Sequence, residues 1–405
     1  MITFSTFKKR LKDVSLCDIG HIFLFILALP CSYVFKIKHP NLWLICEDKM
    51  EARDNGFAFF KYIRTKHPEQ EVYYAIDNKS PDYKKVSKLG KTISYGTFKH
   101  WVYYLTASQN ISSHKGGKPN AAVCYLLEVG GLLKNSRIFL QHGITINNAY
   151  WLFYHKTKFN LFICGAKPEY DFVSNTFGYP LNIVKMTGLA RFDALHENIR
   201  DSKLILVMPT WRNWFYLKSN NENGKLEKVE KSNYLKYWQE FLNSPKLHQI
   251  LEENNLQVLF YPHRNMQPYL DLFKIKSKQI ILAHQKDYDV QDLLKKCALL
   301  ITDYSSVFFD VIYMKKPILF YQFDEQEFRA RQYAKGYFDY ANNPFSIRHI
   351  SLNTLLCDLE KQIKNGFELN EQFLQAHKEY FPLYDTNNCE RIYKEIYKTG
   401  YYTNY

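Results

Sequence analysis

Polar side chains suited to binding phosphate and moving protons recur in this sequence at the ends of short apolar runs. Four groups have this position: Gln141, His142 and Gly143 after residues 137–140; Thr210, Trp211 and Arg212 after residues 204–208; His263 and Arg264 after residues 258–260; and Asp303, Ser305 and Ser306 after residues 299–301. If the apolar runs are strands of parallel sheets, these groups lie at the carboxyl ends of the strands, where α/β sheets bind their ligands. We therefore expect the four groups to converge on one cleft.

The group around Asp303 is the clearest predicted phosphate site. Ser305 or Ser306 would cap the N-terminus of the helix that follows, where free backbone amides and the helix dipole favour an anion. Helix capping without a ligand is the alternative, and the position directly after a strand favours the ligand. Arg212 and Arg264 add guanidinium groups, which match phosphate oxygens bidentately, unless each one pairs with a carboxylate on the surface.

His142 and His263 are the predicted proton carriers. Imidazole titrates near neutral pH, so either ring could take a proton from a hydroxyl or stabilise a leaving group. A single histidine near the end of a sheet would favour a purely structural, hydrogen-bonded role. Two of them, one in each half of the chain, favour catalysis, and we assign the base to His142.

Several common nucleotide and metal motifs are missing from the sequence. It contains no GxxxxGK[ST] loop, no GxGxxG after the first predicted strand, no HExxH and no GxSxG, which argues against the chemistry that each motif supports. The eight cysteines form no CxxC pair, which indicates reduced thiols in a reducing compartment. We therefore predict neither a metal site nor a bound cofactor.

The formal net charge is +14, from 54 Lys and Arg against 40 Asp and Glu. A basic surface attracts polyanions, among them nucleic acids, anionic lipids and phosphate-rich polymers. Because the sequence has no zinc-finger spacing, no RNP-type aromatic motif and no long run of Lys and Arg, nucleic acid is not the predicted partner. A phosphate-rich substrate and an anionic membrane surface both fit the charge.

Short apolar strands alternate with helices along most of the chain, which indicates an α/β fold with doubly wound parallel sheets. Two such series follow one another, and we expect them to form two Rossmann-like domains that face a cleft. The predicted divisions are a membrane-associating segment at 1–40, the two domains at 41–198 and 199–365, and C-terminal helices at 366–405. Within the second domain we expect a loop at 219–231, where no apolar period is found, and one helix at 234–251.

The N-terminal segment has an apolar stretch at 22–29, ended by Pro30. Basic residues flank this stretch: Lys8, Lys9, Arg10, Lys12, Lys36 and Lys38. The stretch is shorter than the about 20 residues that a spanning helix needs, and no small-residue cleavage site follows it. The pattern is typical of a segment that lies in the interface of an anionic membrane. An ordinary buried helix with solvated lysines is the alternative.

The string ITDYSSVFFDVIYMKKPILFYQFDEQEF at 301–328 resembles the signature of the CDP-glycerol glycerophosphotransferases, the primases and polymerases of teichoic acid. Residues 51–56 and 59–62 resemble the early motif of that family. The groups at 141–143, 209–212 and 262–263 match it in order and spacing. The resemblance extends from about residue 41 to residues 390–392, and it is specific because five separated motifs agree.

This resemblance implies a GT-B fold that binds the acceptor on its N-terminal side, where Gln141 and Gly143 lie, and the nucleotide on its C-terminal side. It implies metal-independent, inverting-type transfer at the inner face of the plasma membrane. His142 and His263 match the catalytic histidines of the family, and Ser305 and Ser306 match its donor-phosphate serines. The predicted reaction moves glycerol phosphate, or a related polyol phosphate, from CDP-glycerol or CDP-ribitol to a hydroxyl of a wall teichoic acid or capsule polymer. The resemblance implies a polymeric or lipid-linked acceptor and the release of CMP.

Two other functions remain open at this point. A nucleotide-sugar glycosyltransferase could use the same two-domain scaffold, with Glu325 or Glu327 gripping the ribose. A non-catalytic membrane subunit that binds polyanions would fit the charge, but it would not account for polar groups after strands of both domains. The sequence does not decide the polyol, the acceptor, the oligomeric state or which histidine is the base. It also does not decide whether the chain is a primase, a polymerase or a decorating enzyme.

Overall fold

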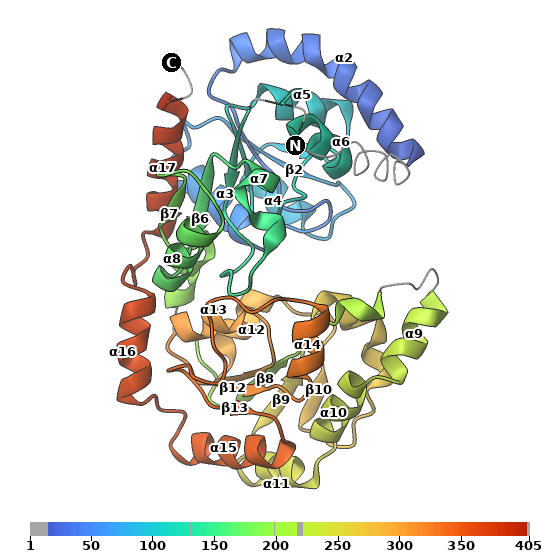
Figure 1. Ribbon diagram of the computed structural model, residues 1–405, viewed down its shortest axis with the longest axis vertical. Helices are drawn as coiled ribbons and strands as arrows, with labels where there is room; N and C mark the ends of the chain where they lie inside the picture. Colours follow the sequence, from blue (N-terminus) through green and yellow to red (C-terminus); the bar gives the residue numbers. More distant parts are fainter. Residues whose placement is uncertain (1–14, 130, 134, 198, 217–221, 403–405) are drawn as a thin grey trace.

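The computed structural model describes residues 15–402, except residues 130, 134, 198 and 217–221. Two lobes, each built on one sheet, are stacked along the long axis of the molecule (Figure 1). The first sheet consists of β1 (Trp43–Ile45), β2 (Val72–Ile76), β3 (Thr92–Ser94), β4 (Gln109–Ser112), β5 (Ser136–Phe139), β6 (Leu161–Cys164) and β7 (Val184–Met186). The second consists of β8 (Leu204–Met208), β9 (Gln257–Phe260), β10 (Ile280–Leu282), β11 (Leu299–Thr302), β12 (Ile318–Tyr321) and β13 (Arg348–His349).

Both sheets are parallel and doubly wound. Their strand orders are β3-β2-β1-β4-β5-β6-β7 and β10-β9-β8-β11-β12-β13. The order reverses between β1 and β4 in the first sheet and between β8 and β11 in the second, and crevices for ligands open at such points. The predicted α/β fold of two Rossmann-like domains is confirmed, while the residue boundaries of the domains stay predictions.

Helices cover both faces of each sheet, which is why most strand residues are buried. In the N-terminal lobe these are α2 (Leu16–Lys38), α3 (Asn55–Lys66), α4 (Tyr83–Leu89), α5 (Phe98–Thr106), α6 (Ala121–Val129), α7 (Tyr154–Thr157) and α8 (Lys167–Thr176), with 3₁₀ turns η1 (Tyr150–Leu152) and η2 (Ala190–His196). In the C-terminal lobe they are α9 (Glu222–Glu230), α10 (Asn233–Leu242), α11 (Pro245–Glu253), α12 (Val290–Lys296), α13 (Phe308–Tyr313), α14 (Glu325–Arg331) and α15 (Leu352–Lys364), with η3 (Asn213–Phe215) and η4 (Arg264–Leu272).

The chain returns to the N-terminal lobe at its end. Helices α16 (Glu371–Tyr380) and α17 (Asn388–Tyr402) run along one side of both lobes (Figure 1). The start of α17 is tied to η2, because the backbone N–H of Asn388 and of Cys389 donates to the two carboxylate oxygens of Asp193 at 2.8 and 2.9 Å. Tyr393 stacks on His67, with ring centroids 3.7 Å apart. Helix α17 therefore ties the end of the chain to the N-terminal lobe.

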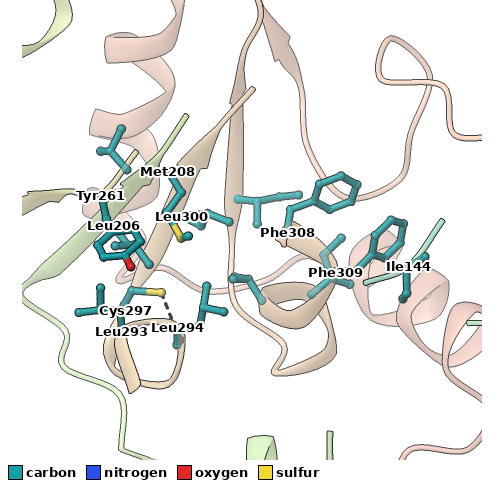
Figure 2. Close-up of a cluster of buried hydrophobic side chains, with 14 of the residues drawn as sticks. Ile144, Leu206, Met208, Tyr261, Leu293, Leu294, Cys297, Leu300, Phe308 and Phe309 are labelled. Atoms are coloured by element: carbon teal, nitrogen blue, oxygen red, sulfur yellow. Dashed lines mark hydrogen bonds between the residues drawn. The ribbon is translucent and has the colours of Figure 1, made fainter. Parts of the chain in front are cut away.

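One apolar core continues through the contact between the lobes. Figure 2 shows Phe308 and Phe309 on α13, with Ile144 of the N-terminal lobe beside Phe309. Leu293 and Leu294 of α12 fill the space beneath β8 and β11. This packing fixes the loops that follow β5 and β11 relative to each other.

Two element predictions in the C-terminal lobe are wrong. The expected loop at 219–231 contains helix α9, whose Val229 is fully buried and whose Glu227 and Lys231 pair one turn apart at 2.6 Å. The single helix expected at 234–251 is two helices, because Pro245 lacks an amide hydrogen and begins a new helix capped by Ser244. Apolar spacing continued through this break and concealed it.

The N-terminal apolar segment is longer than predicted, because α2 continues through Pro30 to Lys38. It is the one helix, within the described part of the chain, that is long and apolar enough to cross a membrane. It lies against α5 and α6 at the outer end of the N-terminal lobe (Figure 1). Phe25, Ala28 and Ser32 face the lobe and are buried. The basic residues at 8–12, which were expected to contact an anionic membrane, lie outside the described residues.

Candidate active site

A cavity of about 200 Å³ opens between the two lobes at the carboxyl ends of their strands. Six of the residues predicted from the sequence line it: His142, Gly143, His263, Arg264, Ser305 and Ser306. His142 and Gly143 follow β5 in the N-terminal lobe, and the other four follow β9 and β11 in the C-terminal lobe. The structure therefore brings together a pair of imidazoles, a guanidinium and two hydroxyls, which is a set that can hold a phosphate and move a proton.

Gln141 does not line the cavity, although it precedes His142. Its side chain is buried, and its amide nitrogen donates to the carbonyl of Ile163 and to Glu169 at 2.7 and 2.8 Å. Its φ of 64° is a left-handed backbone conformation that non-glycine residues rarely adopt. These bonds hold the turn that presents His142, so Gln141 acts here as a support of the loop and not as a contact for the acceptor.

Arg212 and Asp303 also lie outside the cavity, in an ion pair that is fully buried. The Arg212 guanidinium donates to Asp303 at 2.9 Å and to Asp324 at 2.8 Å. Asp303 in turn accepts from the backbone N–H of Thr210 at 2.8 Å, so it joins the loops that follow β8 and β11. This burial contradicts the prediction that both side chains bind donor phosphate. Their role is to lock the base of the loops that form the C-terminal wall.

Ser305 and Ser306 line the cavity, but neither side chain caps a helix as predicted. Helix α13 begins at Phe308, its N-cap is Val307, and no side chain bonds to the amides of its first turn. The Ser305 hydroxyl instead accepts from the backbone N–H of Val307 at 3.4 Å. The serines therefore form a turn before the helix and keep their hydroxyls at the cavity.

His142 is held by an acidic partner that the sequence analysis did not assign. Its Nδ1 bonds to a carboxylate oxygen of Asp54, the N-cap residue of α3, while the side chain remains 70% exposed to the cavity. Although the ring is exposed to the cavity, the surrounding lobes partly desolvate its charged form; the Asp54 carboxylate outweighs this effect and raises the pKa of His142. Against its own burial, Asp54 has a pKa lowered to about 2 by the charges of His142 and Arg191.

His263 is in a different state. Its Nδ1 accepts from the backbone N–H of Asn265 at 3.2 Å, so the neutral ring carries its proton on Nε2. Burial, and then the charges of His142 and Arg264, lower the pKa of His263 to about 3. The ring is therefore a neutral hydrogen-bond donor at neutral pH.

Several further polar residues line the cavity and were missed, among them His114, Glu47 and Arg191. His114 follows β4, and its ring centroid lies 4.6 Å from that of His142. Burial, and then His142, lower the pKa of His114 to about 4. Glu47 follows β1, and burial raises its pKa to about 7. Both residues follow the rule of polar groups after strands, which could have identified them, whereas Arg191 lies in η2 where no sequence signal marked it.

Asp54, His114 and His142 form the one cluster among the described residues that could hold a metal ion, with their ligand atoms within 4.8 Å of one another. Two imidazoles and a carboxylate are a donor set that suits zinc. However, the other oxygen of Asp54 accepts from the Arg191 guanidinium at 2.8 Å, which neutralises the carboxylate and repels a cation. The cluster fits a proton site better than a metal site.

Comparisons with known proteins identify the family of this chain. The family model described as CDP-Glycerol:Poly(glycerophosphate) glycerophosphotransferase matches residues 28–398. The minor teichoic acid biosynthesis protein GgaB of Bacillus subtilis is 29% identical over 378 residues, which are 92% of this chain and 41% of that protein. The teichoic acid poly(glycerol phosphate) polymerase of Bacillus subtilis is 25% identical over 85% of this chain and 47% of its own length.

This chain thus spans less than half the length of these two relatives. Among solved structures, that of the wall teichoic acid polymerase TagF is similar with a TM-score of 0.65, at 16% identity, over 96% of this chain and 98% of that one. The likeness at this identity concerns the fold. Because the family model matches nearly the whole sequence, the chain belongs to the CDP-glycerol:poly(glycerophosphate) glycerophosphotransferase family.

Proposed function

We propose that this protein transfers glycerol phosphate, or a related polyol phosphate, from a CDP-activated donor to a hydroxyl of a wall teichoic acid or capsule polymer and releases CMP. The observation that carries the proposal is the cavity between the lobes. There His142 and His263 meet beside Arg264, Ser305 and Ser306, in a chain of this family. Each lobe contributes one of these two imidazoles.

In the proposed mechanism the acceptor hydroxyl attacks the phosphorus that carries the polyol, and the bond from this phosphorus to CMP breaks. His142 takes the hydroxyl proton. His263 donates a hydrogen bond to the phosphate oxygens through Nε2, and Arg264 offsets their charge. Such transfers depend mainly on positioning and electrostatics. Arg264 also pairs with Glu51 of the N-terminal lobe at 3.0 Å, a contact that a bound phosphate would compete with.

The first experiment incubates the full chain with CDP-glycerol or CDP-ribitol and a lipid-linked acceptor, followed by mass analysis of the product and assay of CMP. We expect CMP release with one of the two donors and growth of the acceptor by the mass of the matching polyol phosphate. His142→Ala and His263→Ala should each lower turnover by roughly 10²–10⁴-fold. His284→Ala, outside the cavity lining, is the control. Absence of transfer from either CDP-polyol, together with transfer from a nucleotide sugar, would contradict the proposal.

The rival nucleotide-sugar reaction lacks support at the residues expected for it. Glu325 pairs with Arg348, and Glu327 pairs with Arg331. Neither glutamate lines the cavity, so neither is placed to grip a ribose there. Comparison of CDP-glycerol, CDP-ribitol and UDP-sugars by thermal shift separates the two functions.

We propose further that the reaction takes place at the inner face of the plasma membrane. Helix α2 supports this location, because one of its faces packs on the lobe. Large apolar side chains on its other face are exposed to solvent, among them Phe23, Ile26 and Leu27. Lys36 and Lys38 lie in its last turn, where they can meet anionic headgroups. A helix packed along a lobe in this way suits a position in the interface.

A further inference from the structure

Two of the histidines that line the cavity, His142 and His263, are held in opposite tautomers. A carboxylate can only accept a hydrogen bond, so the bond from His142 to Asp54 places the proton of that ring on Nδ1 and leaves a lone pair on Nε2. The backbone N–H of Asn265 imposes the reverse on His263, whose proton lies on Nε2. One ring is thus prepared to accept a proton, and the other to donate a hydrogen bond.

We infer that Asp54 is a positioning residue that fixes His142 as the proton acceptor, and that Arg191 aligns this carboxylate with the loop of Ser305 and Ser306. The inference rests on the proposed function for its chemical meaning, but the tautomer of His142 can be measured without any substrate. It also separates the roles of the two histidines, since only His142 has an acidic partner on Nδ1.

The contacts of Arg191 carry the second part of the inference. Its Nη1 donates to Asp54 at 2.8 Å and to the backbone carbonyl of His142 at 2.9 Å. Its Nε and Nη2 donate to the two oxygens of Asp310 at 2.7 and 2.8 Å. Asp310 lies in α13, directly after the serine loop. A single guanidinium therefore joins the base in one lobe to the phosphate loop in the other.

The two oxygens of the Asp54 carboxylate have different partners, which argues against a purely structural role for this residue. Oδ1 accepts from the backbone N–H of Asn55 at 2.7 Å and from Arg191, which is sufficient to cap α3 and to hold the guanidinium. Oδ2 is directed to His142. The side chains of Asp54, Arg191 and Asp310 are each at most 10% exposed. Their contacts are therefore shielded from water, which strengthens their electrostatic effect.

The proton transfer that this arrangement serves is balanced. The acceptor hydroxyl gives its proton to Nε2 of His142 while its oxygen bonds to phosphorus, and CMP leaves with the electron pair of the broken bond. The imidazolium that forms is stabilised by Asp54, and its proton later passes to solvent. The charged groups that face His142 are Asp54 and Glu47, which favour the imidazolium, and Arg191, which opposes it. The rings of His114 and His263 also interact with it.

The test is nitrogen NMR of the full chain labelled with ¹⁵N-histidine, with the His142 signals assigned by their loss in His142→Asn. In the wild type we expect the Nδ1–H tautomer and a pKa above 6.5, the ordinary value. In Asp54→Asn we expect that pKa to fall, the tautomers to mix, and the kcat of CMP release to drop on the order of 100-fold with KM changed only a few-fold. The pH at which kcat rises should shift downward by the same amount as the pKa.

Asp82→Asn is the matched control, because Asp82 is a buried carboxylate that supports the neighbouring loop through Arg53 and touches no histidine. It should leave the tautomer and the pKa of His142 as in the wild type. A wild-type pKa at or below 6.5 would overturn the inference, even if Asp54→Asn failed to fold. An Asp54→Asn protein that loses activity with an unchanged tautomer and pKa would overturn it as well. If the wild type lacks transferase activity but shows the expected tautomer, only the proposed function fails.

Discussion

Gly143 of the N-terminal lobe lies opposite Ser306 of the C-terminal lobe, so close that a Cβ placed on the glycine would be 3.0 Å from the serine Oγ. The lobes thus meet at the cavity through a position where any larger residue must displace the hydroxyl. We expect Gly143→Ala to lower kcat/KM for the donor on the order of tenfold, about 1.4 kcal/mol. The free energy of unfolding should change by less than about 1 kcal/mol.

Gly116→Ala is the control for that substitution, since a Cβ there meets nothing within 4 Å. Steady-state CMP release and denaturant unfolding of both variants make the comparison. Equal losses of activity in the two variants would mean that the contact with Ser306 is not the cause.

Substitution of Arg212 should lower stability, whereas substitution of Arg264 should weaken donor binding. Arg212→Met leaves Asp303 and Asp324 buried without their partner, which costs about 3–5 kcal/mol of unfolding free energy. The Arg264 side chain is 49% exposed, so Arg264→Met should alter stability by less than about 0.5 kcal/mol and raise the KM for the donor. Urea unfolding and donor titration measure the two effects. Wild-type stability in Arg212→Met would show that the buried pair does not hold the loops.

The rule that ligands bind after parallel strands was enough to predict six of the cavity residues. It succeeded because it depends only on chain direction, which apolar runs reveal. It could not separate Arg264 from Arg212, because the burial of Arg212 depends on Asp324, a residue distant in the sequence. It also could not find Arg191, whose position between the lobes depends on the packing of both.

The helices were predicted less well than the strands, for local reasons. Proline at position 30 was expected to end the apolar stretch, but α2 continues because its packing on α5 outweighs the lost backbone bond. Helix α9 has few apolar residues, and its one buried valine and one exposed ion pair form no apolar period that a search could detect.

A buried glutamate beneath the His142 loop should make stability depend on pH. Burial raises the pKa of Glu169 from 4.5 to about 7. Between these values the unfolded chain has already lost the proton that the folded chain retains, so the free energy of unfolding falls as pH rises from about 4.5 to about 7, by up to about 3 kcal/mol. Above that range this contribution to the slope ends.

Glu169→Gln should remove this part of the pH dependence of the unfolding free energy. The glutamine amide fits less well than the carboxylate, which accepts from the backbone N–H of Gly165. Unfolding free energies measured from pH 4.5 to pH 8 supply the slopes. Glu240→Gln, at an exposed position, controls for the loss of a charge. A variant at position 169 with the wild-type slope would contradict the buried, protonatable state.

Helix α2 offers the sharpest test of membrane association, because its two faces can be changed separately. Phe23 and Leu27 are 63% and 61% exposed, whereas Phe25 on the other face is buried. We expect Phe23→Glu with Leu27→Glu to weaken binding to vesicles that contain phosphatidylglycerol by more than tenfold, since each lost apolar side chain removes about 1.5–3 kcal/mol of burial. The unfolding transition should not move. Leu181→Glu with Ile347→Glu places the same two charges at exposed apolar residues away from α2, so equal binding by the two double variants in a sedimentation assay would show that α2 does not face the lipid.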